Sequence, residues 1–391
     1  MVEFQLTFAF VRRGREPRNA PFGKGGPGGF CIFLLLVSFL LAGCQVQPRF
    51  TVAALPGHDA AFERTAGWSG GDGAYTIGLG EGRVLWVFGD TFVGRVKEGR
   101  RVDSRLINNS AALQAGGTPT EASLSFFYKT GADGQPAAFF EPQDGIGWFW
   151  PYHGVKTAEG LFLFLLQVEA AEGPEAFAFR LVATWLGKVE NAAEAPERWK
   201  LAVRKIPWGD ERRLFGSSVL LREGTAYIYG TVDEIIEGVA AKQVILARAP
   251  AERLWDFSAW RFFSEGGWVE EVEAAGRVCE DAAGEFSVSF QPGLGRYVMV
   301  FTEGGLSEHM ALRTAPRPEG PWGEPLRFYS CPEAGWNPTI FCYAAKGHPE
   351  LAAGAGELIV TYVANATDFA LLESDARLYR PRFVKIAFEG F

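Results

Sequence analysis

Short apolar runs, separated by polar or glycine-containing turns, dominate the sequence. Each of the clearest runs follows a tight turn, and another short apolar segment precedes that turn. Runs of this length, bounded by glycine and polar residues, are typical of buried strands, and the intervening turn indicates a hairpin. Long segments with helical periodicity are absent, so the sequence predicts an all-β protein. The five clearest runs are residues 84–88, 161–168, 226–229, 297–301 and 358–363.

The predicted hairpin recurs at intervals of about 50–80 residues, which is the scale of propeller blades with insertions. A third strand that ends in Ala-Pro recurs as well, as VILARAP at 244–250 and MALRTAP at 310–316, each followed by a tryptophan and a short aromatic strand. Five such units predict a five-bladed β-propeller of four-stranded antiparallel blades, in which radial repetition hides the sheet edges. The alternative is a decorated β-sandwich, against which the repeated order argues. The hairpins begin near residues 74, 153, 217, 286 and 340.

The first 43 residues have the composition of a secretory signal. They contain five basic side chains against two acidic ones and end in the thirteen-residue apolar run 30–42, which Gly43 and Cys44 follow. Spanning a bilayer takes about 20 apolar residues, so the pattern favours a signal peptide over a transmembrane helix. The tetrapeptide Leu-Ala-Gly-Cys at 41–44 resembles the lipobox of bacterial lipoproteins. An ordinary signal peptide with a chance cysteine is the alternative.

The lipobox implies cleavage before Cys44 and lipidation of its thiol. We therefore expect an exported lipoprotein that is anchored to a membrane in the periplasm or at the cell surface. Residues 1–43 would be the signal peptide, residues 44–60 a tether, and residues 61–391 a single five-bladed catalytic domain, since no composition shift divides them. We expect the mature protein to be a monomer.

Charge and cysteine content exclude several kinds of site. Without residues 1–43 the chain keeps 33 basic and 44 acidic side chains, a net charge of −11, and it has no basic block of the kind that binds nucleic acid. A neutral polymer is therefore the easier partner. Three cysteines remain after Cys44, so no closed disulfide framework is implied, although Cys331 and Cys342 could pair across a loop. Without a Cys-x-x-Cys pair or a histidine-rich segment, we expect no metal site.

Two aspartates flank the first predicted hairpin. Asp72 lies in the glycine-rich segment 70–73 before the first strand, and Asp90 follows the second strand. Because a hairpin brings its two ends together, we expect both carboxylates near one face of the propeller channel, which the first strand of each blade lines. The glycines leave room for close backbone approach to Asp72. Each aspartate alone could be an ordinary turn residue.

A third carboxylate could reach the channel from a later blade. Glu285 precedes the innermost strand of the fourth repeat, and Glu303 and Asp233 are rivals at neighbouring strand ends. Each of the three could equally be a solvated loop acid. Two or three converging carboxylates fit glycoside hydrolysis, in which one protonates the leaving oxygen and one activates water or attacks the sugar. Like charges and burial would raise the pKa of one of them enough to hold a proton near neutral pH.

Several aromatic, amide and cationic side chains near the channel-facing loops are candidates for contacts with a sugar. Aromatic rings stack on sugar rings, and an arginine offers a rigid fork of donors. Packing between blades is the alternative for the tryptophans, and surface ion pairing for the arginines. The candidates are Trp68, Arg105, Asn109, Trp150, His153, Trp336, Arg380 and Arg382.

The segment GGDGAYTIGLGEGRVLWVFGDTFVG at 70–94, with Asn-Ser-Ala at 109–111, resembles the five-bladed propellers of the DUF4185 family, and so does the end of the chain from residue 358 to residue 383. Those proteins are related to the arabinanase and fructosidase superfamily, which includes glycoside hydrolases like those of family 43. The resemblance covers most of residues 62–389 and is specific only at the first hairpin and the C-terminus.

The resemblance implies a hydrolase that cleaves a polysaccharide of the arabinan or furanoside type. It implies that Asp72 is the base or nucleophile, Asp90 the second aspartate, and Glu285 the general acid. No cofactor would be required, although a structural Ca²⁺ ion is compatible with it. Two alternatives stay open: a non-catalytic glycan-binding lipoprotein, and a glycoside phosphorylase, which would need a basic phosphate pocket such as Arg380 and Arg382 could form.

Overall fold

The computed structural model describes residues 47–173, 178–236, 239–280, 282–351 and 353–389. The predicted signal peptide and Cys44 lie outside the described residues, so export and lipidation stay predictions. Among the residues described, no helix has both the length and the hydropathy needed to cross a membrane.

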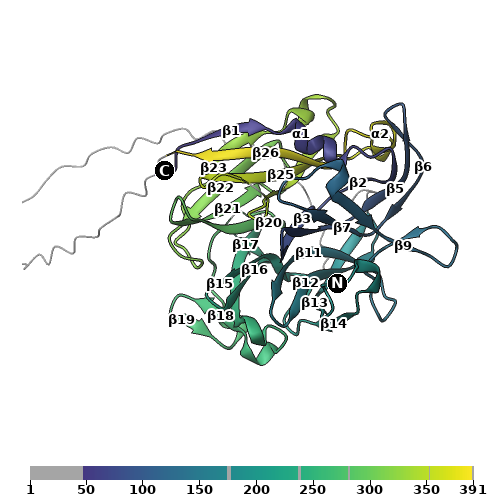
Figure 1. Cartoon of the computed structure of the whole chain (residues 1–391). Helices are drawn as coiled ribbons and strands as arrows, with labels where there is room; N and C mark the ends of the chain where they lie inside the picture. The colour runs from purple at the N-terminus through teal and green to yellow at the C-terminus, as the bar shows by residue number, and fades with distance from the viewer. Residues whose placement is uncertain (1–46, 174–177, 237–238, 281, 352, 390–391) are drawn as a thin grey trace, which may run out of the picture. The chain divides into compact units, whose positions relative to one another are not determined.

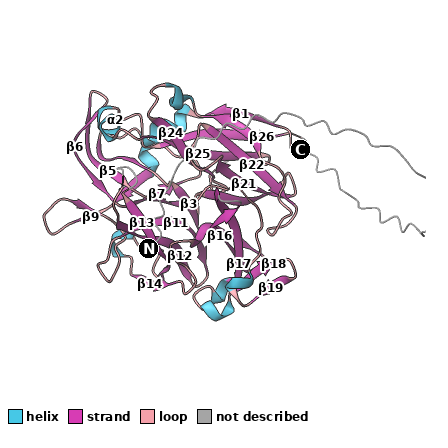
Figure 2. Ribbon diagram, turned by 180° about the vertical axis from the view of Figure 1, so that it is seen from behind, coloured by secondary structure: helices cyan, strands magenta, loops and turns pink. Residues whose placement is uncertain are grey.

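Five antiparallel sheets form most of the described structure, and the prediction of an all-β protein is confirmed (Figures 1 and 2). Each sheet begins with one of the five hairpins. The first contains β3 (Tyr75–Gly80), β4 (Arg83–Phe88), β7 (Ser110–Ala115) and β8 (Leu124–Phe127). The second contains β11 (Trp148–Thr157), β12 (Gly160–Ala170), β13 (Phe179–Val189) and β14 (Leu201–Lys205).

The third sheet has five strands, because the chain turns back once more after its fourth strand. These are β15 (Arg213–Arg222), β16 (Thr225–Ile236), β17 (Val239–Pro250), β18 (Arg261–Ser264) and β19 (Gly267–Val269). The fourth contains β20 (Phe286–Gln291), β21 (Arg296–Thr302), β22 (His309–Ala315) and β23 (Leu326–Ser330). The fifth contains β24 (Ile340–Gly347), β25 (Glu357–Ala366), β26 (Pro381–Phe388) and β1 (Phe50–Ala54).

Smaller elements decorate these sheets. A three-stranded sheet inserts around the first hairpin, and a two-stranded ribbon follows it. Helices are short, and Figure 2 shows them as small cyan segments among the strands. The elements are β2 (Ala66–Gly71), β5 (Thr91–Lys97) and β6 (Arg100–Ile107), the ribbon β9 (Lys129–Thr130) and β10 (Pro136–Ala137), and the helices α1 (Pro56–Asp59) and α2 (Phe369–Ser374), besides short 3₁₀ turns.

The first strands of the five sheets contact one another in chain order: β3 with β11, β11 with β15, β15 with β20, and β20 with β24. The order returns to β3 through a side-chain hydrogen bond of 2.8 Å between Thr76 Oγ1 and His348 Nδ1, directly after β24. The innermost strands of different sheets therefore lie beside one another, so side chains from different sheets can meet.

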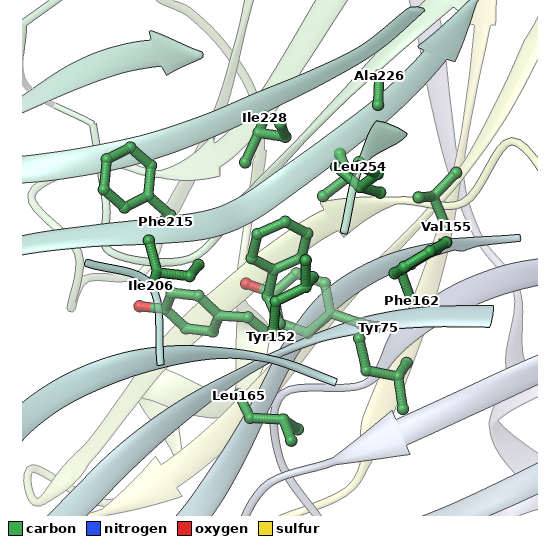
Figure 3. Packing of buried hydrophobic residues seen from close by; sticks show 14 of the residues in the cluster. Tyr75, Tyr152, Val155, Phe162, Leu165, Ile206, Phe215, Ala226, Ile228 and Leu254 are labelled. Atoms are coloured by element: carbon green, nitrogen blue, oxygen red, sulfur yellow. The ribbon is translucent and has the colours of Figure 1, made fainter. Parts of the chain in front are cut away.

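Apolar packing between sheets explains why some strands are apolar throughout. In β12, Leu161 to Leu166 are at most 2% exposed, because this strand has a neighbour on each side and packed sheets on both faces. Figure 3 shows the surrounding cluster, in which Tyr75 and Tyr152 lie among aliphatic and aromatic side chains of the second and third sheets. A sequence of this kind does not alternate as a half-exposed strand would.

The N-terminal strand β1 completes the fifth sheet. Its five residues pair antiparallel with β26, from Phe50 opposite Phe388 to Ala54 opposite Val384, and Figure 1 shows the purple strand beside the yellow one. The prediction that residues 44–60 form a tether is therefore wrong for residues 50–59, which form β1 and α1. A short strand without a hairpin partner in sequence has no local signal, and here it covers an otherwise open sheet edge.

Removing β1 should destabilise the protein. A chain that begins at residue 56 loses the five paired residues and the half-buried Phe50 and Val52 side chains, which pack on the core of the fifth sheet. We expect the free energy of unfolding to fall by about 2 kcal/mol or more relative to a chain that begins at residue 47. Urea denaturation of the two chains measures this, and equal stabilities would contradict the assignment of β1 to the sheet.

Candidate active site

Asp72 and Asp90 meet where the first hairpin opens. The backbone N–H of Asp72 donates to the carbonyl oxygen of Asp90 at 3.3 Å, and the N–H of Gly89 donates to the carbonyl oxygen of Asp72 at 3.1 Å. A Cβ atom at position 89 would clash with Asp72 Oδ1, so the carboxylate needs the space that glycine leaves. The structure thus places the two aspartates side by side, as the hairpin argument predicts.

Two tyrosine hydroxyl groups fix the side chain of Asp72. Tyr343, on β24, donates to Asp72 Oδ2 at 2.5 Å, and Tyr379, just before β26, donates to the same oxygen at 2.8 Å. Asn365 in turn donates to the hydroxyl oxygen of Tyr343 at 3.3 Å. Tyr343 lies in the fifth sheet and Tyr379 directly precedes its strand β26. These hydrogen bonds therefore connect the segment before the first hairpin to the last sheet.

A buried arginine also connects the segment before the first hairpin to the segment before β26. Arg101 donates to the carbonyl oxygens of Ser69 and Leu378 at 2.9 and 2.8 Å, just before the segments that carry Asp72 and Tyr379. Its guanidinium also lies over the ring of Phe92, 4.6 Å from the centroid. Burial lowers the pKa of Arg101 to about 10, so it stays charged at neutral pH and keeps these donors.

Asp90 is held by neutral donors. Trp150 Nε1, on β11, donates to Asp90 Oδ1 at 2.8 Å, and the side chain of Asn108 donates a second hydrogen bond. Among the described residues, no Lys or Arg nitrogen lies within 4.0 Å of a carboxylate oxygen of Asp72 or Asp90. The donors to Asp90 are therefore dipoles, which favour its charged form less than a cation would.

Glu285 reaches the same place from the fourth sheet, directly before β20. Its Oε1 accepts a hydrogen bond from Lys346 Nζ at 2.9 Å, and the Lys346 side chain is 1% exposed against 22% for Glu285. The Lys346 ammonium also lies 4.2 Å from the ring centroid of Tyr75. The negative charge of Glu285 acts on Asp72 and raises its pKa, so the three carboxylates form one electrostatic group.

Burial and mutual repulsion raise the pKa of both aspartates. For Asp90 the causes are burial and then the charge of Asp72. For Asp72 they are burial and then the charge of Glu285, which Tyr343, Tyr379 and Lys346 partly offset. The two aspartates and Glu285 are nevertheless only half-buried, so water reaches them. Burial and the charge of Asp72 therefore favour a protonated Asp90.

Trp150 is the one predicted substrate-contact residue that touches the carboxylates. Trp68 is 1% exposed and stacks on Phe126 with ring centroids 4.6 Å apart, so it is a core residue. Buried Asn109 holds the backbone of Phe140 and Phe149. For both residues the predicted sugar contact is wrong, because packing and backbone hydrogen bonds already use these side chains.

His153 also has no free ring nitrogen. Its Nε2 is 3.0 Å from the carbonyl oxygen of Thr76, and the N–H of Val219 donates to its Nδ1 at 2.8 Å. Burial lowers the pKa of His153 to about 4, which favours the neutral ring that both bonds require. His153 therefore joins the first three sheets, and its predicted contact with a sugar is wrong.

The remaining predicted contact residues have partners in ion pairs or stacks, and their contact with a sugar stays a prediction. Sequence cannot show which surface acid an arginine meets. The interactions are Arg105 with Asp133 at 2.7 Å, Arg380 with Glu63 at 2.7 Å, Arg382 with Asp59 at 3.3 Å, and 44%-exposed Trp336 under the guanidinium of Arg377. The rival acids are paired too, Glu303 with Arg327 at 2.6 Å and Asp233 with Lys242.

Tyr343 and Lys346 are the site residues that the sequence did not indicate, and Tyr379 stood out only as part of the segment 379–382. The available signal was a lysine inside an apolar strand, in the segment IFCYAAKG at 340–347. A register shift between Tyr343 and Lys346, with Ala344 at a φ of 59°, lets both side chains face the interior. Strict alternation would put residues three apart on opposite faces of the strand. The bulge therefore brings Tyr343 and Lys346 to the same side.

Cys331 and Cys342 form a disulfide next to this bulge, as sequence analysis allowed. With Glu333 they are the one group of His, Cys, Asp and Glu side chains, within the described part of the chain, whose donor atoms lie within 4.8 Å of one another. Calcium prefers six to eight oxygen ligands, so this group does not suit the Ca²⁺ ion that sequence analysis allowed.

Stability should depend on pH through the two aspartates. Their pKa is higher in the folded protein than in the unfolded chain, so the folded protein binds more protons and loses stability as pH rises above the usual carboxyl range. We expect Asp90→Asn to remove much of this loss. The free energy of unfolding of the variant, relative to that of the wild type, should therefore rise by about 3 kcal/mol between pH 4 and pH 8. Urea denaturation across this range checks it, and parallel pH profiles for both proteins would contradict it.

Comparison with known proteins gives a fold likeness and a family. No curated protein matches the chain. A structure from Bacteroides ovatus ATCC 8483, provisionally described as a hydrolase, is 20% identical over 86% of this chain and 90% of that one, with a TM-score of 0.69, and shares its fold.

Two further structures are more distant, and their likeness indicates nothing about function. A thermostable family-43 glycoside hydrolase is 15% identical over 83% of this chain and 92% of that one, with a TM-score of 0.46. The catalytic domain of a GH62 α-L-arabinofuranosidase from Coprinopsis cinerea is 13% identical over 87% and 97%, with a TM-score of 0.44. The expected membership of DUF4185 is not confirmed, because the family whose sequence model matches, over residues 57–388, is another: the chain belongs to DUF5005, a domain family of unknown function.

Proposed function

We propose that this protein is a glycoside hydrolase that cleaves a polysaccharide, of the arabinan or furanoside type, in the channel of a five-bladed propeller. The observation that carries the proposal is that Asp72, Asp90 and Glu285 are half-buried and interact electrostatically, Glu285 with Asp72 and Asp72 with Asp90, although they come from different parts of the chain. Hydrolysis of a glycosidic bond needs a proton donor and an anionic carboxylate close together, and this group has the charge distribution to supply both.

Asp72 is the anionic member. Two hydroxyl groups donate to its Oδ2, and such donors stabilise a carboxylate more than a carboxylic acid. The pKa of Tyr343 and of Tyr379 lies well above the usual value, so both remain protonated donors. Asp72 Oδ1 is left to accept a proton from an attacking water molecule, which makes Asp72 the base.

The arrangement of the sheets supports the propeller. The five first strands contact one another in chain order and bring residues of the first, second, fourth and fifth sheets to the carboxylates. A channel between blades gives a sugar chain access from one end and gives the reacting groups a rigid frame.

The charges favour a neutral sugar. Among the described residues, the cation that pairs with the three carboxylates is Lys346, and Glu285 already uses it. A uronic acid or phosphate group would meet an excess of negative charge, which also argues against a phosphorylase. Export as a lipoprotein anchored through Cys44 would place the enzyme where polysaccharides are found.

Loss of either aspartate should abolish most of the activity. On a panel of plant, fungal and bacterial polysaccharides we expect Asp72→Asn and Asp90→Asn to lower kcat by about 10²–10⁴-fold, because each removes an acid–base group. Glu303→Gln is the matched control, since Glu303 pairs with Arg327 elsewhere. Full activity in both aspartate variants would refute the site, and binding of a glycan without product by the wild type would favour a non-catalytic glycan-binding protein.

Trp150 should matter to the reaction, whereas Trp336 should not. Trp150→Phe keeps an aromatic side chain but removes the donor to Asp90, and a hydrogen bond between uncharged groups contributes about 0.5–1.5 kcal/mol. We therefore expect kcat/KM to fall by up to about tenfold. Trp336→Ala removes a surface ring that stacks with Arg377 and should leave kcat/KM unchanged. Steady-state kinetics on the same polysaccharide distinguish the two, and the reverse ranking would contradict this placement.

A further inference from the structure

The surroundings of Glu285 and Asp90 differ in one decisive respect. Glu285 accepts a hydrogen bond at 2.9 Å from the Lys346 ammonium, which pairs with no other carboxylate among the described residues. Asp90 instead accepts hydrogen bonds from the neutral donors Trp150 and Asn108. A contacting cation favours the charged form of a carboxylate, and a neutral donor in a buried place does so far less. The two candidate acids are therefore not equivalent.

Lys346 is held where it can act on the whole group. Its side chain is 1% exposed, its ammonium lies 4.2 Å from the ring centroid of Tyr75, and its charge also lowers the pKa of Asp72. Burial lowers the pKa of Lys346, and the charges of Glu285 and Asp72 raise it, so the lysine and the two carboxylates stabilise one another's charged forms. A buried ammonium without such partners would lose its proton.

We propose that Lys346 is a positioning residue that keeps Glu285 and Asp72 as anions, so that Asp90 carries the proton that the leaving group takes up. This inference rests on the proposed function. In the step, the glycosidic C–O bond breaks, and its electron pair stays on the oxygen that receives the proton of Asp90. Water gives its hydroxyl group to the sugar and its proton to Asp72. Glu285, for which the family resemblance implies the acid role, remains an anion throughout.

Other titratable groups also surround Lys346 and the three carboxylates. They come from the first, second and fifth sheets. Burial keeps the tyrosines protonated and the histidines neutral, so none of them adds a charge beside Lys346. The groups that interact electrostatically with Lys346 or the three carboxylates are Tyr75, Tyr152, His153, Tyr343, His348 and Tyr379.

Leaving groups of graded acidity identify the proton donor. A nitrophenyl glycoside needs no proton on departure, whereas an alkyl glycoside or a polysaccharide does. We expect Asp90→Asn to lose at least 100-fold in kcat on the polysaccharide but less than tenfold on the nitrophenyl glycoside. Glu285→Gln should lose similar factors on both. The opposite pattern would overturn the proposal: Glu285→Gln would then be nearly as active as the wild type on the nitrophenyl glycoside but inactive on the polysaccharide.

The pH profile tests Lys346 itself. Lys346→Met keeps the volume and removes the charge, so the pKa of Asp72 rises and the acidic limb of kcat/KM moves up by about one pH unit or more. Lys346→Arg should restore the limb, and Lys129→Met, which breaks the exposed ion pair with Glu141, should not move it. A Lys346→Met enzyme that loses rate without a shifted limb would show a structural role only and overturn the proposal.

A titration without substrate separates this inference from the proposed function. Carboxyl ¹³C resonances of Asp90 and Glu285, assigned by their loss in Asp90→Asn and Glu285→Gln, report each protonation state directly. We expect Glu285 to be ionised at a pH at which Asp90 is protonated. A wild-type protein that releases no sugar from any polysaccharide would refute the hydrolase, and the titration would still decide the charge order. If Glu285 takes up its proton at a higher pH than Asp90 does, the role of Lys346 is refuted.

Discussion

The candidate site depends on hydrogen bonds that join the two ends of the fold. Asp72 precedes the first hairpin, yet its side chain is fixed by Tyr343 and Tyr379 of the last sheet. Arg101 reinforces the junction by donating to carbonyl oxygens on both sides of it. An arginine buried in this way satisfies polar backbone groups that would otherwise be left without partners at the meeting of two sheets. Position and charge of the central carboxylate therefore follow from how the first and last sheets are joined.

The innermost strands adapt to this task by leaving regular geometry at comparable places. Register shifts interrupt β11 between Pro151 and Gly154, β15 between Phe215 and Ser218, and β24 between Tyr343 and Lys346. A bulge changes which face a side chain occupies, so each of these strands can present two polar or aromatic groups inward over a short length.

The sequence contained enough information for the hairpins and for the two aspartates. Strong apolar runs bounded by glycine specify strands locally, and a hairpin necessarily brings Asp72 and Asp90 together. Residues whose role depends on distant partners could not be found in this way. Nothing near Tyr379 in the chain indicates that its hydroxyl meets Asp72, and the neighbouring Arg380 and Arg382 gave the stronger signal.

Trp68 and Asn109 show the opposite failure. Trp68 packs on Phe126 of the first sheet, and the side chain of Asn109 donates to the backbone of Phe140 and Phe149. The strand β1 was missed for a similar reason, since its partner β26 lies more than three hundred residues away. Exposure and partner identity are properties of the assembled sheets, and a single sequence carries them only through its locally paired strands.

The pairing of β1 with β26 also means that the last sheet can be completed only after residues 381–388 have been synthesised. The carboxylates of the first hairpin are made early, but Tyr343, Lys346 and Tyr379, which set their charges, emerge from the ribosome near the end, and β1 has no partner until β26 exists. Contacts of such sequence separation form late in folding. A chain that stops before residue 343 would contain both aspartates yet lack Tyr343, Lys346 and Tyr379, so the site could form only after the last sheet is made.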